Sequence, residues 1–245
     1  MVQETVLFLQ RLGVEIDGIG TSTLTVHGKG AIGKDIEYTI AEDPIESMFF
    51  LTAALMTSSS LTIRRCPIDF LELELYKLRQ MGFRFDCSER YLAENGFTNL
   101  VDITTFPSRL TALEDRIHSL PYPGINADNL PFFAPIACMA RGTTKIHDWM
   151  YEDRAAYYLL LNTMGADVVL RSRHAAEING IRTLYSAEVE SPMALRPAAV
   201  VLLTMLAAKG RSILRNTYPI RRGYEDLAGR LNQLGAKVNL VRQTD

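Results

Sequence analysis

The sequence predicts an α/β fold (α+β) built from a repeated unit, and three patterns indicate it. A Leu-Gly or Met-Gly pair ends an amphipathic helical pattern four times, with glycines at Gly13, Gly82, Gly165 and Gly235. Each pair is followed by a β-rich run, and in three cases a more apolar helical stretch comes earlier in the unit. Glycine suits the position just past a helix because positive φ carries no Cβ penalty there. The unit is therefore helix–strand–helix–strand–strand.

The spacing of these glycines is 69, 83 and 70 residues. Solenoid repeats have periods of about 20–50 residues, so a pseudo-symmetric domain with buried helices and outer sheets is favoured. The apolar helical stretches are 48–56, 130–140 and 197–208. A helix that is apolar on most sides is usually buried in protein, and these are shorter than the roughly 20 residues that span a bilayer.

The first 40 residues match the second half of a unit. We expect a helix over 2–12, strands over 13–16 and 24–27, and a hairpin-like segment over 28–40. The matching first half would come from an upstream portion or from another chain. Asp43 and Pro44 then favour a turn or helix start and mark a domain junction.

The later part of the chain continues the pattern with one irregular insertion. Residues 87–121 are the least regular, and we expect a short helix over 110–116 there. Strands are expected over 176–178 and 183–187, on either side of the turn Asn179-Gly180, and the last repeat fills 192–242.

Composition excludes several classes of function. The formal net charge of −2 implies no bulk attraction to nucleic acid or to an acidic membrane surface. The three cysteines are odd in number and lack metal-site spacing, so we expect reduced thiols that serve packing. The four histidines are scattered and form no zinc motif, and the first residues do not read as a signal peptide. We therefore expect no metal and no cofactor.

Four short motifs, in order along nearly the whole chain, resemble the enolpyruvyl transferases, and among them those of peptidoglycan synthesis. They are Tyr-Pro-Gly at 122–124 followed by Asp128, Glu-Asp-Arg at 152–154, Ala-Leu-Arg at 194–196, and Arg-Gly-Tyr-Glu at 222–225. The resemblance covers only the C-terminal part of a typical member.

The resemblance implies a fold of inverse α/β barrels, each made of three repeats, on either side of a cleft. Residues 1–42 would then close a first barrel, and residues 43–245 would form most of the second. The stretches that carry the family's lysine and its mobile cysteine loop are absent, so none of the three cysteines inherits a catalytic role. A partner chain or a missing N-terminal segment would complete the enzyme.

The implied reaction transfers the enolpyruvyl group of phosphoenolpyruvate to the 3-hydroxyl of UDP-N-acetylglucosamine and releases phosphate in the cytoplasm. Such chemistry needs cations for a phosphate and a carboxylate, and arginine binds oxyanions in bidentate fashion. The resemblance assigns phosphoenolpyruvate contacts to Arg154, Arg196 and Arg222. Each lies near the start of an expected helix in successive repeats, so pseudo-symmetry would bring them to one end of the domain. The alternative for any single arginine is a solvated surface charge.

Two further residues take roles from the resemblance. Asp128 matches the general base that also contacts the sugar hydroxyl, and Met150 matches a backbone contact to the nucleotide sugar. The alternative for Asp128 is capping of the following helix.

Two departures from the family pattern lie beside these residues. Ala194 stands where an acidic residue is usual, and the segment 124–133 around Asp128 is altered. Two other functions therefore stay open: a non-catalytic binding or regulatory paralogue, and the related transferase that acts on shikimate 3-phosphate.

Overall fold

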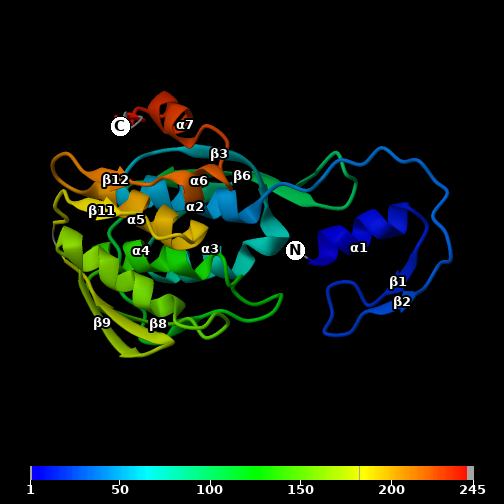
Figure 1. Cartoon of the computed structure of the whole chain (residues 1–245), viewed down its shortest axis with the longest axis horizontal. Coiled ribbons are helices and arrows are strands. Elements are labelled where there is room, and N and C mark those ends of the chain that lie inside the picture. Colours follow the sequence, from blue (N-terminus) through cyan, green and yellow to red (C-terminus); the bar gives the residue numbers. More distant parts are fainter. Residues whose placement is uncertain (1, 182, 242–245) are drawn as a thin grey trace.

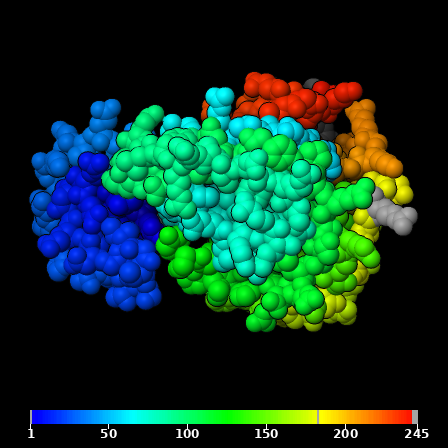
Figure 2. All heavy atoms as spheres, turned by 180° about the vertical axis from the view of Figure 1, so that it is seen from behind, coloured from blue at the N-terminus to red at the C-terminus, as the bar shows by residue number. Residues whose placement is uncertain are grey.

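The computed structural model describes residues 2–181 and 183–241. An N-terminal unit consists of α1 (Val2–Arg11), β1 (Glu15–Asp17) and β2 (Thr25–His27), the two strands pairing antiparallel. It lies beside the main body, to which residues 28–43 lead (Figure 1). The space-filling view from behind shows the same arrangement (Figure 2). The guanidinium group of Arg11 lies over the ring of Phe97, 5.3 Å from its centroid, and joins the two parts.

The main body begins with a helix and a sheet in which the last strand is central. The elements are α2 (Pro44–Met56), β3 (Thr62–Pro67), η1 (Ile68–Phe70), α3 (Glu72–Gln80), β4 (Arg84–Cys87), β5 (Tyr91–Leu92) and β6 (Asn99–Phe106). The strand order is β3-β6-β4, and β5 also pairs with β6. Asp43 caps α2 by accepting a hydrogen bond from the amide of Ile45 at 2.8 Å.

The second repeat again has the order helix, strand, helix, strand, strand, with a short additional strand, β7, ahead of it. It consists of β7 (Ile117–His118), η2 (Leu130–Phe132), α4 (Phe133–Met139), β8 (Thr143–His147), η3 (Arg154–Met164), β9 (Asp167–Ser172) and β10 (Ala175–Asn179). Its sheet runs β7-β8-β10-β9, so the last strand again lies between the two before it.

The third repeat starts in the same way. Its elements are β11 (Glu188–Glu190), α5 (Leu195–Ala207), β12 (Ile213–Arg215), α6 (Tyr218–Arg221) and α7 (Leu227–Gln233). Strands β11 and β12 pair in parallel, as β7 and β8 do. In the described part of the chain, no strand pairs with residues 236–240, which occupy the place of β9 in the repeat.

The apolar helices form the centre of the main body. Helices α2, α4 and α5 contact one another and lie inside the sheets (Figure 1). Their largest side chains, such as Met48, Phe49 and Phe133, have no exposed surface. This confirms the predicted α/β fold with inner helices and outer sheets. The four pivot glycines all have positive φ, between 83° and 95°, which confirms their place at helix ends.

Three local predictions were wrong. Residues 28–40 form no hairpin, because most of their side chains are exposed and no strand lies alongside to pair with them in the described chain. Residues 110–116 form no helix, because backbone amides there bond to distant carbonyls: Thr111 to Met81 at 2.8 Å and Ala112 to Arg141 at 2.9 Å. The strand expected over 183–187 is reduced to a single bridge between Tyr185 and Lys209.

Other predictions need smaller changes. The segment from Arg154 to Met164 is helical as predicted, but it is an 11-residue 3-10 helix rather than an α-helix. The helix expected over 130–140 divides into η2 and α4. In the described residues, no helix has both the length and the hydropathy of a membrane crossing. The domain boundary near residue 43 stays a prediction.

Candidate active site

Asp128 lies between two arginines in the loop ahead of η2. Its two carboxylate oxygens are 3.6 Å from Nη1 of Arg154 and 3.6 Å from Nη2 of Arg196. The three side chains are mostly buried, with 20%, 10% and 17% of their surface exposed. The sequence thus brings a carboxylate and two guanidinium groups from three separate segments into one cluster. Attraction between such charges is strongest where water is partly excluded.

Arg154 is held in place by a second carboxylate, Asp148. The Nε and Nη2 atoms of Arg154 each donate to one oxygen of Asp148 at 2.6 Å, a bidentate pair. Nη2 also donates to the carbonyl oxygen of Ala127 at 2.6 Å. The remaining nitrogen of the guanidinium group, Nη1, faces Asp128. Arg154 is therefore oriented by the protein and is not a freely moving surface charge.

Asp148 has no exposed surface and directly follows β8. It also accepts a hydrogen bond from the hydroxyl of Tyr158 at 2.9 Å. Burial, together with the neighbouring Asp148 carboxylate, raises the pKa of Tyr158 well above its ordinary value, so the phenol stays a donor. The ring of Tyr151 packs against the guanidinium group of Arg154, 4.3 Å from its centroid. Aromatic packing and three acceptors together restrict Arg154 to one orientation.

Arg196 is the second residue of α5, where backbone amides of the first turn carry partial positive charge. Tyr224 lies close by: burial raises the pKa of its phenol, and the charge of Arg196 opposes that rise. Gly223 packs tightly on the same helix start, since a Cβ there would lie 2.2 Å from Cδ2 of Leu195. The segment that carries Arg222 therefore lies against the start of α5.

The predicted site residues differ in how the structure places them. Asp128, Arg154 and Arg196 meet, whereas Arg222 is exposed at the end of α6 and makes no ion pair within the described residues. Its convergence with the other two arginines stays a prediction. Met150 is 42% exposed in the loop after β8, and its contact with a nucleotide sugar also stays a prediction.

Two interpretations of these residues were wrong. Asp128 does not cap the next helix: Asn129 occupies the cap position of η2, which has no side-chain cap bond, and the Asp128 carboxylate faces the arginines. The arginines also do not occupy equivalent repeat positions. Arg154 begins the second helix of its repeat, Arg196 is the second residue of the first helix of the next, and Arg222 directly follows a short additional helix.

Sequence reasoning missed Asp148, although its position gave a signal. A carboxylate directly after an expected strand and six residues before an arginine has the reach to orient that arginine. Reasoning from motifs missed it because the matched motif begins at residue 152 and leaves Asp148 outside.

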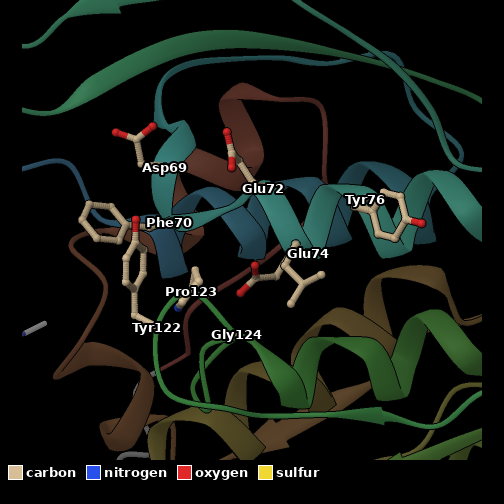
Figure 3. Close-up of a pocket in the computed structure, with 9 residues that line it drawn as sticks. Asp69, Phe70, Glu72, Glu74, Tyr76, Tyr122, Pro123 and Gly124 are labelled. Atoms are coloured by element: carbon tan, nitrogen blue, oxygen red, sulfur yellow. The ribbon is translucent and has the colours of Figure 1, made fainter. Parts of the chain in front are cut away.

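Two hollows and one group of possible metal ligands lie apart from this cluster. A hollow of about 240 Å³ is lined by residues of η1, α3 and the loop 122–124, among them Glu74 and Tyr122 (Figure 3). A larger one of about 590 Å³ lies between residues 40–50, β3 and α7. Neither is lined by Asp128, Arg154 or Arg196. Among the described residues, the one group with metal-ligand geometry is Glu15, Asp17 and His27, all exposed on the N-terminal hairpin.

Comparison with known proteins supplies the family. Residues 1–231 match the family EPSP synthase (3-phosphoshikimate 1-carboxyvinyltransferase). The chain is 32% identical over 242 residues to UDP-N-acetylglucosamine 1-carboxyvinyltransferase of Anaplasma marginale, covering 96% of this chain and 52% of that protein. It is 34% identical over 229 residues to the enzyme of the same name from a Sulfurovum species, covering 92% and 50%.

Solved structures agree with these sequence relatives. The enolpyruvyl transferase NikO from Streptomyces tendae superposes with a TM-score of 0.78 at 28% identity, covering 96% of this chain and 53% of that one. An EPSP synthase from Acinetobacter baumannii, at 18% identity and a TM-score of 0.75, shares the fold. The chain spans about half the length of the curated relatives it matches. With a family match over most of its length, the chain belongs to the EPSP synthase family of enolpyruvyl transferases.

Proposed function

We propose that this chain supplies one half of the active site of an enolpyruvyl transferase that acts on UDP-N-acetylglucosamine. The reaction transfers the enolpyruvyl group of phosphoenolpyruvate to the 3-hydroxyl of the sugar and releases phosphate. The observation that carries the proposal is the carboxylate of Asp128 held 3.6 Å from Arg154 and from Arg196. The names of the sequence relatives support the acceptor.

The roles follow from the charges. Arg196, at the start of α5, and Arg222, next to Gly223, which lies against Leu195 of the same helix, would bind the anionic groups of phosphoenolpyruvate. Asp128 would accept the proton that the sugar hydroxyl loses as it forms the new C–O bond. Arg154, which is oriented by Asp148, would hold Asp128 in place through Nη1. This function places the chain in the cytoplasm.

We also propose that a complementary polypeptide completes the enzyme, and the third sheet supports this. In the first two repeats the last strand lies between the strand after the first helix and the strand after the second helix. The side chain of Asn162 accepts a hydrogen bond from the backbone amide of Val168 and donates one to its carbonyl oxygen. Asn232 makes the same two hydrogen bonds with Val238. Residues 236–240 therefore have the register of β9, and a strand from the complementary half would pair between them and β12.

Phosphate release tests the proposal. It is measured from phosphoenolpyruvate plus UDP-N-acetylglucosamine with this chain alone, and again after adding the half of the Sulfurovum relative that this chain does not match. Activity that appears only on mixing supports the proposal. Silence after mixing, with UDP-N-acetylglucosamine still bound, would favour a non-catalytic binding module, as Ala194 suggests. Release that requires shikimate 3-phosphate as acceptor would favour the related reaction instead.

Variants of the mixed enzyme assign the residues. Asp128→Asn should lower kcat by about 10²–10⁴-fold if the carboxylate is the base. Arg222→Ala should weaken phosphoenolpyruvate binding by about tenfold or more, since a hydrogen bond to a charged group contributes about 1.5–3 kcal/mol. Arg221→Ala, an exposed neighbour, is the matched control and should change neither. Near-normal turnover of Asp128→Asn would exclude the base role.

A further inference from the structure

A buried carboxylate on α3 contacts the loop that carries Asp128. Glu74 is 1% exposed, and its side chain points from α3 toward the loop of Pro123 and Gly124 (Figure 3). Its Oε1 accepts a hydrogen bond from the amide of Asn126 at 3.0 Å and another from Nδ2 of Asn129 at 2.9 Å. Burying a carboxylate is costly, so both bonds offset an unfavourable burial. Accordingly, burial raises the pKa of Glu74 although the two bonds oppose that rise.

The bonds from Glu74 continue to Asp128 through the loop itself. The Oδ1 of Asn126 accepts the amide hydrogen of Asp128 at 2.9 Å, and the amide of Asn129 donates to the carbonyl oxygen of Asn126 at 2.9 Å. Between them, the carbonyl oxygen of Ala127 accepts from Arg154. The turn 126–129 is thus tied to α3 on one side and to the arginine cluster on the other.

Asn129 shows how much this turn depends on Glu74. Its side chain has no exposed surface, and its Oδ1 has no hydrogen-bond partner within the described residues. The bond from Nδ2 to Glu74 is therefore what orients the amide. Without an acceptor at position 74, the amide of Asn126 and Nδ2 of Asn129 would both be buried donors without partners, and the turn would rearrange.

We propose that Glu74 is a positioning residue for the transferase reaction, which sets the orientation of Asp128 through the turn 126–129. This rests on the proposed function. The role requires an acceptor oxygen at position 74 and does not require the negative charge. Glu74 also lines the 240 Å³ hollow, together with Glu72, whose side chain is exposed and pairs with Arg90 at 2.6 Å.

Three variants test the proposal. Glu74→Met fills similar space without an acceptor, Glu74→Gln keeps the acceptor without the charge, and Glu72→Gln removes a charge beside the same hollow. Amide hydrogen exchange of residues 124–130 is measured on the chain, and kcat on the enzyme mixed with its complementary half. We expect Glu74→Met to speed exchange by about tenfold and lower kcat by about tenfold or more. Glu74→Gln and Glu72→Gln should stay within about threefold of the unaltered chain in both measurements.

The outcomes separate this proposal from the proposed function. Unchanged exchange in Glu74→Met would overturn the proposal, whether or not the mixed enzyme turns over. Faster exchange with unchanged kcat would also overturn it, because loosening the turn would then have no consequence for Asp128. If the unaltered mixed enzyme shows no turnover, the proposed function fails, while exchange still decides whether Glu74 holds the turn.

Discussion

Asp148→Asn should destabilise the chain more than any conservative change on its surface. Asp148 is fully buried and accepts three hydrogen bonds, two from Arg154 at 2.6 Å and one from Tyr158 at 2.9 Å. Asparagine keeps one acceptor oxygen, loses the charge, and turns an N–H group toward a guanidinium group. Removing one partner of a buried ion pair costs about 3–5 kcal/mol, because the other charge is left uncompensated. Tyr158→Phe removes only one bond to a charged group and should cost about 1.5–3 kcal/mol.

Unfolding in urea, followed by fluorescence, measures both losses. Trp149 is the only tryptophan, is 44% exposed and follows Asp148 directly, so its emission reports this region. A second test is the double variant Asp148→Asn with Arg154→Gln. Its loss should be smaller than the sum of the two single losses, because no unpaired charge remains. Strictly additive losses of the free energy of unfolding, or a loss below about 0.5 kcal/mol for Asp148→Asn alone, would contradict the conclusion that Asp148 holds the charge of Arg154 in place.

Two further predictions concern packing. Gly180→Ala should lower the free energy of unfolding by about 1–3 kcal/mol, because the added Cβ would lie 1.6 Å from the backbone carbonyl oxygen of Ala140, which cannot turn away as a side chain can; an unchanged urea midpoint would contradict this. Of the three free thiols, only exposed Cys87 should react with a thiol reagent in the native chain, while Cys66 and Cys138 should react after unfolding. Burial raises the pKa of Cys66 and of Cys138 to about 12, so counting three reactive thiols in the native state would argue against their burial.

The parts of the fold that sequence predicted are those set by local chemistry. Gly82 and Gly165 follow helices and have φ of 95° and 83°, a conformation that glycine adopts without penalty. The stretches around Phe49, Ile136 and Val200 are apolar on most sides. They therefore have no polar face to turn toward solvent, and they form buried helices. In both cases, the residues that predict the structure lie within a few positions of it in the sequence.

The parts that sequence did not predict depend on partners far along the chain. Residues 110–116 have a helical pattern, yet the amide of Thr111 bonds to Met81 and Thr111 forms a bridge with Arg141. Glu74 lies on a helix whose spacing suggested only an amphipathic stripe, and its partners are 52 and 55 residues away. A single sequence does not reveal such pairs, because nothing near Glu74 distinguishes it from the solvated acids beside it.

The position of the charge cluster follows from the buried helices and not from equivalence among the arginines. Helices α2, α4 and α5 pack on one another. Charges at the starts of two of them act on the pKa of Tyr224: Asp43 raises it and Arg196 lowers it. A helix start carries partial positive charge and stabilises acids, as Asp43 does at the start of α2. At α5 the equivalent position is Ala194, which makes no cap bond, and the first turn carries Arg196. Two sources of positive charge thus coincide at the start of α5, and the carboxylate of Asp128, 3.6 Å from Nη2 of Arg196, supplies negative charge there although position 194 carries no acid.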